Sequence, residues 1–415
     1  MTPRPSPDHL VLLALWVMVF SVSSQFMVVA PILPRIAEQL SVPPASLGLL
    51  VSGYALAVGI VAVVMGPISD RVGRRRMLLA GTAVMAVALA MHGLARDFAT
   101  LLTVRVLAGA GGGILTGAAA AYVGDYFPYH RRGWALGWVM SGMAAGQILG
   151  VPIGALVAER AGFRLPFVLF GATMALGWAV AWFFLPQPNV APSGDALSPA
   201  AGLRHYASLL ARPGVVAGAA AYLAIFTGSA FFVVYFPGWL EAARGTSPTE
   251  VAAVFSAGGV ATILVGPRAG RLSDAIGRRV VVISASLGMA LLLAFAPWGV
   301  RGAWSAGVLF FLLMALVAAR SSGLDAALTE IVPGTQRGSM MSLLMATGQL
   351  GFGVGGALAG YVYGTIGYAA NAALAAAAAL GVALIAWRFL PEPERAAGPR
   401  TRRSGFAPAP RPGRP

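Results

Sequence analysis

Three ionisable side chains interrupt long apolar runs, and they are the first candidates for chemistry. Arg105 lies in the run Leu101–Gly112, and Arg320 and Asp325 lie in the run 303–328. A charge inside a membrane is costly unless it is paired or hydrated, so such residues usually hold an opposite charge or carry a proton. Arg320 and Asp325 are five residues apart, which is not the spacing of helix neighbours, so no direct ion pair is expected. The alternatives are a structural Arg105 bonded to backbone carbonyls of the first helix and a gate charge at Asp325.

A charged phrase occurs twice. It runs from Gly66 to Arg75 and from Gly270 to Arg279, and its Gly, Ser, Asp, Gly, Arg and Arg match at an offset of 204 residues. Each copy separates two apolar runs of helix length, which predicts a duplicated membrane bundle. The first glycine of each copy removes bulk where a helix ends near a neighbour, and the second permits a tight turn. An arginine-rich loop with turn glycines would explain the arginines but not the repeated spacing. The candidate residues are Gly66, Asp70, Arg71, Gly73, Arg74 and Arg75, with Gly270, Asp274, Gly277 and Arg278 in the second copy.

Two further sets of residues repeat at almost the same distance. The offset is 205 residues, and the sets lie on both sides of the next loop in each half. Three markers at nearly one offset support duplication of the whole bundle. The pairs are Asp125 with Glu330, Pro128 with Pro333, Arg132 with Arg337, Gly146 with Gly351 and Gly150 with Gly355.

Composition excludes an ordinary soluble domain. Of the 415 residues 58% are hydrophobic and 10% are charged, and the mean hydropathy is +0.78. The net charge of +15 does not indicate nucleic-acid binding, because the arginines lie in short loops and a tail without interleaved aromatic residues. The absence of cysteine excludes disulfides and thiolate chemistry. The four histidines, His9, His92, His130 and His205, have no metal-ligand spacing, so no metal or other cofactor is expected.

Twelve stretches are long and apolar enough to cross a bilayer. We divide the chain into an N-terminal bundle (1–185), a linker (186–212), a C-terminal bundle (213–390) and a disordered basic tail (391–415). One interfacial helix is expected in the linker, at Gly202–Leu210. The first stretch has no cleavage site and is interpreted as a retained span. The stretches are 10–33, 46–66, 77–95, 98–122, 133–157 and 165–185, then 213–238, 251–270, 279–297, 303–328, 338–361 and 367–390.

The arginines predict the orientation of these spans. Of the 29 arginines, six lie in odd-numbered loops, two inside spans and the remaining 21 in even-numbered loops or at the termini. Because basic residues concentrate on the cytoplasmic side, both termini and the linker are predicted to be cytoplasmic. The prediction is a multi-pass protein of a bacterial inner membrane.

The duplicated phrase resembles a known family. The first copy is similar to the cytoplasmic signature between helices 2 and 3 of the major facilitator superfamily, and the second to its counterpart between helices 8 and 9. The resemblance covers nearly the whole chain and implies an all-α fold of twelve transmembrane helices in two six-helix bundles. It also implies a gate in which Asp70 and Arg74 pair with Asp125 at the end of helix 4, with Glu330 as the equivalent of Asp125. Ala275 departs from the pattern, since the first copy has Arg71 there.

The fifth stretch carries a ladder of small residues. Gly142, Gly146, Gly150 and Gly154 recur every four residues, with Pro152 among them. Such a ladder lets two helices touch backbone to backbone, and the proline bends or loosens the span. The ladder resembles the antiporter signature of drug exporters in this family, which favours export; ordinary close packing is the alternative. The end of the first span, from Ala30 to Ala37 with Pro31 and Pro34, resembles twelve-span drug–proton antiporters, and we expect its prolines to stop the helix.

The sequence indicates an ion gradient as the energy source. The glycine clusters 109–113 and 351–356 do not follow a strand, and the chain has no lysine for a nucleotide-binding loop. Arg105 resembles the helix 4 arginine that the family uses in proton coupling, and Asp325 is the candidate titratable group. The first span has Gln25 where many drug exporters of the family have an acid, so proton coupling depends on the resemblance more than on these residues.

Polar and aromatic residues near the middle of the spans outline a cavity. We expect about half of these residues to line it. Amides, aromatic rings and few charges suit amphiphilic, neutral or weakly charged molecules. The candidates are Gln25, Phe26, Tyr54, Gln147, Tyr222, Phe226, Gln349 and Phe352.

We therefore predict a monomeric secondary transporter that exports small amphiphilic compounds by proton antiport. The small-molecule substrate, protons and the lipid bilayer are its expected partners. The alternative is a carrier of a sugar or small metabolite, possibly without proton coupling. A membrane enzyme would need a cluster of acids, bases or metal ligands, which the sequence lacks. A non-transporting sensor is expected to lose the gate charges, which are present.

Overall fold

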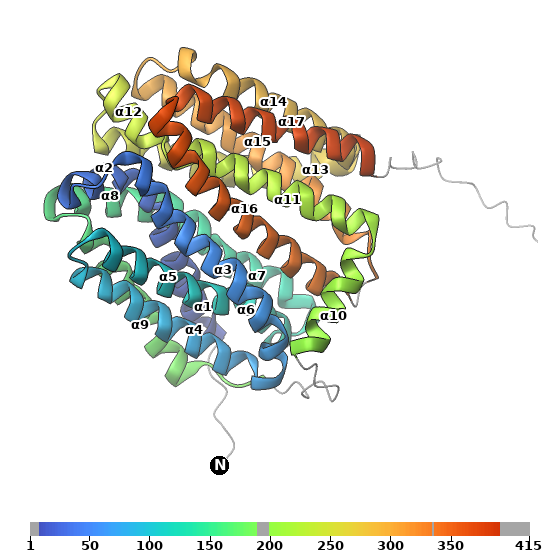
Figure 1. Ribbon diagram of the computed structural model, residues 1–415. Coiled ribbons are helices and arrows are strands. Elements are labelled where there is room, and N and C mark those ends of the chain that lie inside the picture. Colours follow the sequence, from blue (N-terminus) through green and yellow to red (C-terminus); the bar gives the residue numbers. More distant parts are fainter. Residues whose placement is uncertain (1–7, 189–198, 334–335, 391–415) are drawn as a thin grey trace, which may run out of the picture.

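The computed structural model describes residues 8–188, 199–333 and 336–390, apart from the side chains of 66, 67, 69–71, 199–203 and 205. The described residues form helices and no strands. Figure 1 shows two bundles packed side by side, the first from α1 to α9 and the second from α11 to α17. The helices are α1 (Asp8–Met27), α2 (Val29–Leu40), α3 (Pro44–Val72), α4 (Arg74–Met91), η1 (His92–Leu94), α5 (Phe98–Leu115), α6 (Ala118–Tyr126), α7 (Tyr129–Ala145), η2 (Gly146–Gly150), α8 (Val151–Ala161), α9 (Arg164–Phe184), α10 (Pro199–Leu210), α11 (Pro213–Val233), α12 (Phe236–Arg244), α13 (Pro248–Ile276), α14 (Arg278–Gly299), α15 (Ala303–Thr329), α16 (Arg337–Thr365) and α17 (Tyr368–Phe389).

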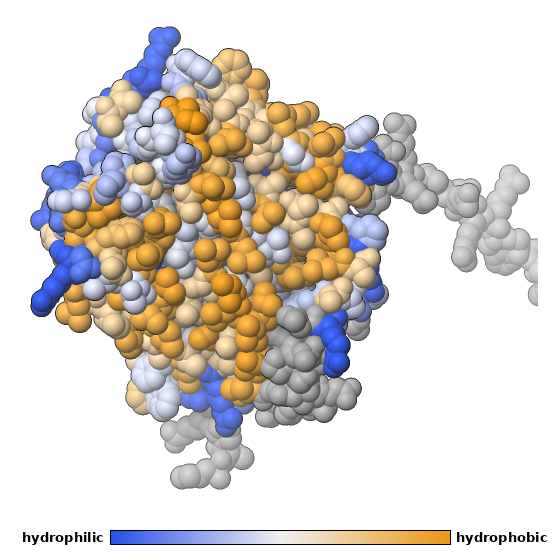
Figure 2. Space-filling view, in the orientation of Figure 1, coloured by the Kyte–Doolittle hydropathy of each residue, from blue (hydrophilic) through white to orange (hydrophobic). Residues whose placement is uncertain are grey.

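Twelve helical segments are long and apolar enough to cross a membrane, and they correspond one to one with the twelve predicted stretches. The space-filling view of Figure 2 shows a broad apolar surface, with hydrophilic residues toward the ends of the helices. The linker helix α10 begins at Pro199, three residues before the predicted start at Gly202. The tail 391–415 lies outside the described residues. The protein is therefore an all-α, multi-pass membrane protein.

Four spans are broken into shorter helices: the first (α1, α2), the fourth (α5, α6), the fifth (α7, η2, α8) and the seventh (α11, α12). The break in the fourth lies at Gly117, whose φ of 74° is in the left-handed region. Proline and glycine weaken the helical hydrogen-bond ladder, and neighbouring helices can make up the loss.

The prediction that Pro31 and Pro34 stop the first helix is wrong. Both lie within α2, which continues to Leu40 and ends at Ser41 in the left-handed conformation, with a φ of 51°. Pro31 is in the first turn of α2, where a backbone N–H has no intrahelical acceptor to lose. The chain therefore bends at Val28, and the prolines do not end the helix.

The alternation of spans gives the molecule two ends. We call the end with the first residues of α1, α4, α7, α14 and α16 the arginine-rich end, because Arg74–Arg76, Arg131, Arg132, Arg278 and Arg279 lie there. The opposite end, with α2, α8 and α12, is the arginine-poor end. In Figure 1 α2, α8 and α12 lie near one another, and α10 lies far from them.

The repeated glycines do the same structural work in both bundles. A methyl group at Gly146 would lie 2.8 Å from Ser23 of α1, and one at Gly351 would lie 2.7 Å from the Leu223 carbonyl oxygen of α11. The first helix of each bundle thus touches the fifth across a glycine. This equivalence is what a duplicated bundle requires.

Candidate functional site

A path of five aromatic rings joins the two bundles near the middle of the spans. The ring centre of Tyr54 of α3 lies 5.6 Å from that of Phe26 of α1, and the ring centre of Phe26 lies 5.4 Å from that of Phe352 of α16. Phe352 is 6.5 Å from Phe226 of α11, which stacks on Tyr222 at 6.1 Å. All five residues belong to the predicted cavity set, and the structure brings them together. We call them the aromatic path.

At the end of this path that lies in the first bundle is Arg105, which is 1% exposed. Its Nη1 donates to Gln25 Oε1 at 2.9 Å, and Gln25 Nε2 donates to the Tyr54 hydroxyl at 2.8 Å. The guanidinium also lies 4.5 Å from the centre of the Tyr54 ring, and Nη2 has no partner among the described residues. Arg105 therefore holds a side chain of the first helix, and the one backbone carbonyl that it contacts, Leu50 at 3.5 Å from Nε, belongs to α3 and not to the first helix of the structural alternative. The acceptor is the neutral amide of Gln25 and not a carboxylate.

The C-terminal end of the path is Asp325 of α15. The Tyr222 hydroxyl donates to Asp325 Oδ1 at 2.5 Å. Arg320 is 2% exposed and has no ion pair or hydrogen bond among the described residues, in line with the five-residue spacing. Its Nε lacks an acceptor although the side chain borders a small cavity of about 40 Å³. Apart from Arg320 and Ser229, this cavity is lined by apolar residues of α11, α14, α15 and α17.

The two mid-span glutamines lie outside the aromatic path. Gln147 of η2 sits against α13, where a methyl group at Gly259 would be 3.3 Å from its Cγ. Gln349 of α16 has a buried Oε1 without a donor among the residues that the structure describes. Both are half-buried.

The bundles touch closely at the arginine-poor end along α3 and α16. A methyl group at Gly48 would overlap the Gly356 carbonyl oxygen, and one at Gly360 would overlap that of Ala45. Nearer mid-span, a methyl group at Gly353 would lie 2.6 Å from Leu56. Figure 1 shows α3 and α16 running beside each other where the two bundles meet. We call this contact the α3–α16 seam.

A second seam joins the fifth span to α13. A methyl group at Gly259 would lie 2.5 Å from Ile148 Cγ1, so the glycine allows Ile148 to approach. Pro152 has no N–H to give the Ile148 carbonyl four residues earlier. That carbonyl lies 3.1 Å from the Ser256 hydroxyl across the bundles, and the hydroxyl shares its hydrogen between it and the Ala252 carbonyl of its own helix, also at 3.1 Å. The sequence analysis missed Ser256, although Pro152 could have indicated that a carbonyl is left free.

The glycine ladder faces a different neighbour. Methyl groups at its four glycines would meet Trp16, Ser23, Ser24 and Val28, all in or next to α1. The ladder therefore packs the fifth span on the first span of its own bundle, and the other face of the fifth span makes the seam. The ladder residues are Gly142, Gly146, Gly150 and Gly154.

At the arginine-rich end the described ion pairs stay within one bundle. Arg74 Nε lies 3.0 Å from Asp125 Oδ2, in the first bundle. Arg278 pairs with Glu330 at 2.5 Å and with Asp274 at 3.6 Å, in the second. Methyl groups at Gly137 of α7 or Gly266 of α13 would meet nothing within 4 Å, and the same holds for Gly133 and Gly270. The fifth span and α13 thus separate toward this end, and Gly270 makes no close contact in this conformation.

The remaining residues of the duplicated phrase hold their own bundle together. Gly73 and Gly277 have φ of 94° and 104°, so both make the left-handed turn for which glycine was predicted. Arg75 donates to the carbonyls of Trp182 and Leu185, and Arg279 donates to that of Trp387. Each arginine therefore binds the C-terminal end of the last span of its bundle, a site that favours a cation.

The other predicted gate residues are placed as follows. Arg132 donates to the Phe127 carbonyl at 3.0 Å, and Arg337 is exposed at the start of α16. The side chains of Gly66, Asp70 and Arg71 lie outside the described residues. Among the residues that the structure describes, no three histidine, aspartate or glutamate side chains gather as metal ligands would.

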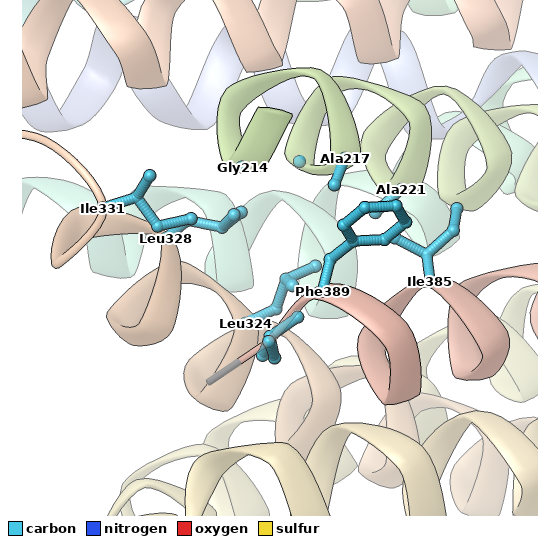
Figure 3. Close-up of a pocket in the computed structure, with 10 residues that line it drawn as sticks. Gly214, Ala217, Ala221, Leu324, Leu328, Ile331, Ile385 and Phe389 are labelled. Atoms are coloured by element: carbon cyan, nitrogen blue, oxygen red, sulfur yellow. The ribbon is translucent and has the colours of Figure 1, made fainter. Parts of the chain in front are cut away.

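A shallow apolar pocket lies between α11, α15 and α17. Figure 3 shows its labelled side chains, among them Leu328, Ile385 and Phe389, as carbon atoms only. It lies within one bundle and offers no polar group to orient a ligand. The aromatic path and its two charged ends are therefore the better candidate site.

Twelve apolar spans in two bundles are the architecture of a membrane transporter, and comparisons with known proteins agree. The family model of the Major Facilitator Superfamily matches residues 15–242 and 218–413, and the chain belongs to this family. It is a transporter rather than an enzyme.

The chain is similar to multidrug resistance proteins of bacteria. It is 27% identical over 405 residues to multidrug resistance protein MdtG of Proteus mirabilis, covering 95% of this chain and 99% of that one. It is 29% identical over 307 residues to MdtG of Salmonella paratyphi B, covering 72% and 75%. Among solved structures, a D-xylose-proton symporter matches with a TM-score of 0.74 and 18% identity over 93% of this chain and 98% of that one, which supports the fold.

Proposed function

We propose that this protein exports small amphiphilic compounds in exchange for protons by alternating access. The observation that carries the proposal is the one-sided contact between the bundles. The α3–α16 seam and the Ser256–Ile148 bond join them toward the arginine-poor end, whereas the gate charges at the other end pair within each bundle. A site that opens toward one end only is what alternating access requires of each state.

The direction of export is supported by similarity and by the glycine ladder. The relatives are multidrug resistance proteins. We take the arginine-rich end as cytoplasmic because basic residues concentrate on that side. The conformation is then open to the cytoplasm and closed to the outside. The moving bodies are residues 1–185 and 213–390, and the chain acts as a monomer because it holds both halves of the pathway.

The aromatic path is the proposed substrate site. Its rings suit apolar and aromatic bodies, and the hydroxyl of Tyr54 and the carboxylate of Asp325 suit polar groups. For antiport, substrate and proton must compete for a site. Asp325 is the proposed proton carrier because the substrate can reach it at the Tyr222 end of the path. Arg105, bonded to Gln25, is proposed to link binding at the other end to movement of the first span.

Arg320 favours a second candidate function. A buried guanidinium without an acceptor, beside a cavity, suits the acidic group of a small metabolite. An acid bound there would oppose the charge of Asp325, so acid and proton would bind together. Binding of acid and proton together is typical of a symporter and does not suit an exporter driven by antiport. An uncoupled carrier could also use such an acid site.

The test is proton flux in proteoliposomes that hold the purified protein and an internal pH dye, challenged with amphiphilic compounds, small organic acids and sugars. Antiport predicts that amphiphiles move protons in the opposite direction, and that Arg105→Ala and Asp325→Asn abolish the signal. Arg105→Lys, which keeps the charge, should retain part of it. Substrate movement without proton movement, or proton movement in the same direction as the substrate, would contradict the proposal and favour the metabolite carrier.

A further inference from the structure

We infer that Tyr235 is a latch that holds the arginine-poor end closed. Its hydroxyl donates to the Pro44 carbonyl at 2.9 Å and accepts from the Gly48 N–H at 2.8 Å. Tyr235 lies at the break between α11 and α12, in the second bundle, whereas Pro44 and Gly48 form the first turn of α3, in the first. One hydroxyl thus ties the two bundles together. The inference rests on the proposed alternating access and names a residue that sets its equilibrium.

The surroundings fix the position of this hydroxyl. Tyr235 is 4% exposed, and its ring stacks on Tyr363 of α16 at 4.7 Å. A methyl group at Gly360 would lie 2.6 Å from the Tyr235 oxygen, and one at Gly48 would lie 3.0 Å from it. Two glycines of the seam therefore leave room for the phenol, so the α3–α16 seam and the latch are one contact.

Opening the latch requires little free energy, because of the two groups that the hydroxyl binds. Gly48 N–H and the Pro44 carbonyl are four residues apart, which is the pairing of an α-helix. When the bundles separate, these two groups can pair with each other, and the phenol can bind water. Opening leaves no buried polar group without a partner, whereas a latch that bonded to unpaired groups would. A contact that must break in every transport cycle benefits from this arrangement.

A purely structural role for Tyr235 predicts something else. The break in the seventh span leaves backbone groups to satisfy, but the Tyr235 hydroxyl reaches over to α3 and not to its own helix. Removing it should therefore change how often the bundles separate and leave each bundle intact.

The experiment compares two tyrosines that touch each other. Tyr235→Phe removes the hydroxyl of the latch, and Tyr363→Phe removes a neighbouring hydroxyl that has no hydrogen bond among the described residues. The chain has no cysteine, so Ala161→Cys and Ala243→Cys, both exposed on opposite bundles at this end, can carry two spin labels. Their distance distribution in proteoliposomes gives the ratio of open to closed molecules.

Tyr235→Phe should raise the open-to-closed ratio by roughly five- to tenfold, the effect of about one hydrogen bond, and leave the melting temperature within the range of Tyr363→Phe. Gly360→Ala, whose methyl group would meet both the phenol and α3, should raise the ratio further. An unchanged ratio in Tyr235→Phe beside a shift in Gly360→Ala would overturn the latch and leave alternating access standing.

The latch and the proposed function fail differently. The labels need neither substrate nor proton. A shift in Tyr235→Phe without any substrate-dependent proton flux would support the latch and contradict antiport. A single distance in every variant, Gly360→Ala included, would contradict both the latch and the movement on which it rests.

Discussion

The two ends of the molecule are held by different kinds of contact. At the arginine-poor end the bundles meet through glycines, hydroxyls and backbone carbonyls, such as Gly48 on Gly356 and Ser256 on Ile148. At the arginine-rich end the described ion pairs each stay within one bundle. Neutral, close-packed surfaces can join without leaving a charge unpaired, whereas charges must find new partners first.

The two arginines of each copy of the duplicated phrase have different partners. Arg75 and Arg279 bind the last span of their own bundles and make each bundle one body. Arg74 and Arg278 hold carboxylates that a closed arginine-rich end would need to share between the bundles. The phrase therefore supports the rigidity of each bundle, and we propose that it also forms the gate between them.

The largest expected effect comes from adding a methyl group to the α3–α16 seam. Gly48→Ala would overlap the Gly356 carbonyl oxygen, so the arginine-poor end should not close and transport should fall to background. Gly266→Ala is the matched control, because its methyl group would meet nothing within 4 Å. Substrate uptake by proteoliposomes compares the two, and equal activity would show that the seam need not close.

A smaller effect is expected from the arginines that bind helix ends. Arg75→Ala should lower the stability of the first bundle by about 1 kcal/mol, since a charged donor to two carbonyls at the end of α9 is lost. Arg76→Ala, at the exposed neighbour, should change little. Thermal unfolding measures both, while the spin-label ratio at Ala161 and Ala243 should stay the same. A changed ratio with unchanged stability would assign Arg75 to the seam.

A third effect tests the bond made possible by Pro152. Ser256→Ala removes the hydrogen bond to the Ile148 carbonyl and should raise the open-to-closed ratio at the arginine-poor end by about fivefold, for about 1 kcal/mol. Ser229→Ala is the control, because both hydroxyls bond to a carbonyl of their own helix and only that of Ser256 also reaches the other bundle. If both variants shift the ratio equally, the cross-bundle bond does not hold the seam.

The smallest effect concerns the exposed loop before α5. The backbone N–H and the hydroxyl of Thr100 donate to the Asp97 carboxylate, at 2.8 and 3.0 Å, and hold the pKa of Asp97 below its usual range. A lowered pKa in the folded state stabilises above the unfolded pKa, and this contribution is lost as pH falls through the folded value. The melting temperature of Asp97→Asn should therefore approach that of the wild type as the pH is lowered below 4 or so. A difference that stays constant would mean that the charge contributes nothing.

Most of the fold was predictable, because a membrane span is a property of about 20 consecutive residues. The twelve spans and the turns at Gly73 and Gly277 follow from local sequence. Pro31 and Pro34 misled, since a proline ends a helix only where its missing N–H and its ring are not accommodated. That choice depends on how α2 packs, which the local sequence does not contain.

The site was predictable in its residues and less so in its partners. Phe26, Tyr54, Tyr222, Phe226 and Phe352 were recognised as mid-span aromatic residues, but their order along the path depends on how the two bundles meet. Tyr235 was missed because it binds backbone groups, which leave no mark on the sequence of α3. Its partner site depends on how the two bundles meet at this end.

The most direct test of the account measures both ends in one preparation. Labels at Ala161 and Ala243 report the arginine-poor end, and labels at Gly133 and Ala275, on α7 and α13, report the arginine-rich end. We predict that the first distance is short and the second long in the resting protein, and that an amphiphile or a lowered external pH lengthens the first while it shortens the second. Two distances that rise and fall together, or that respond to neither, would contradict alternating access.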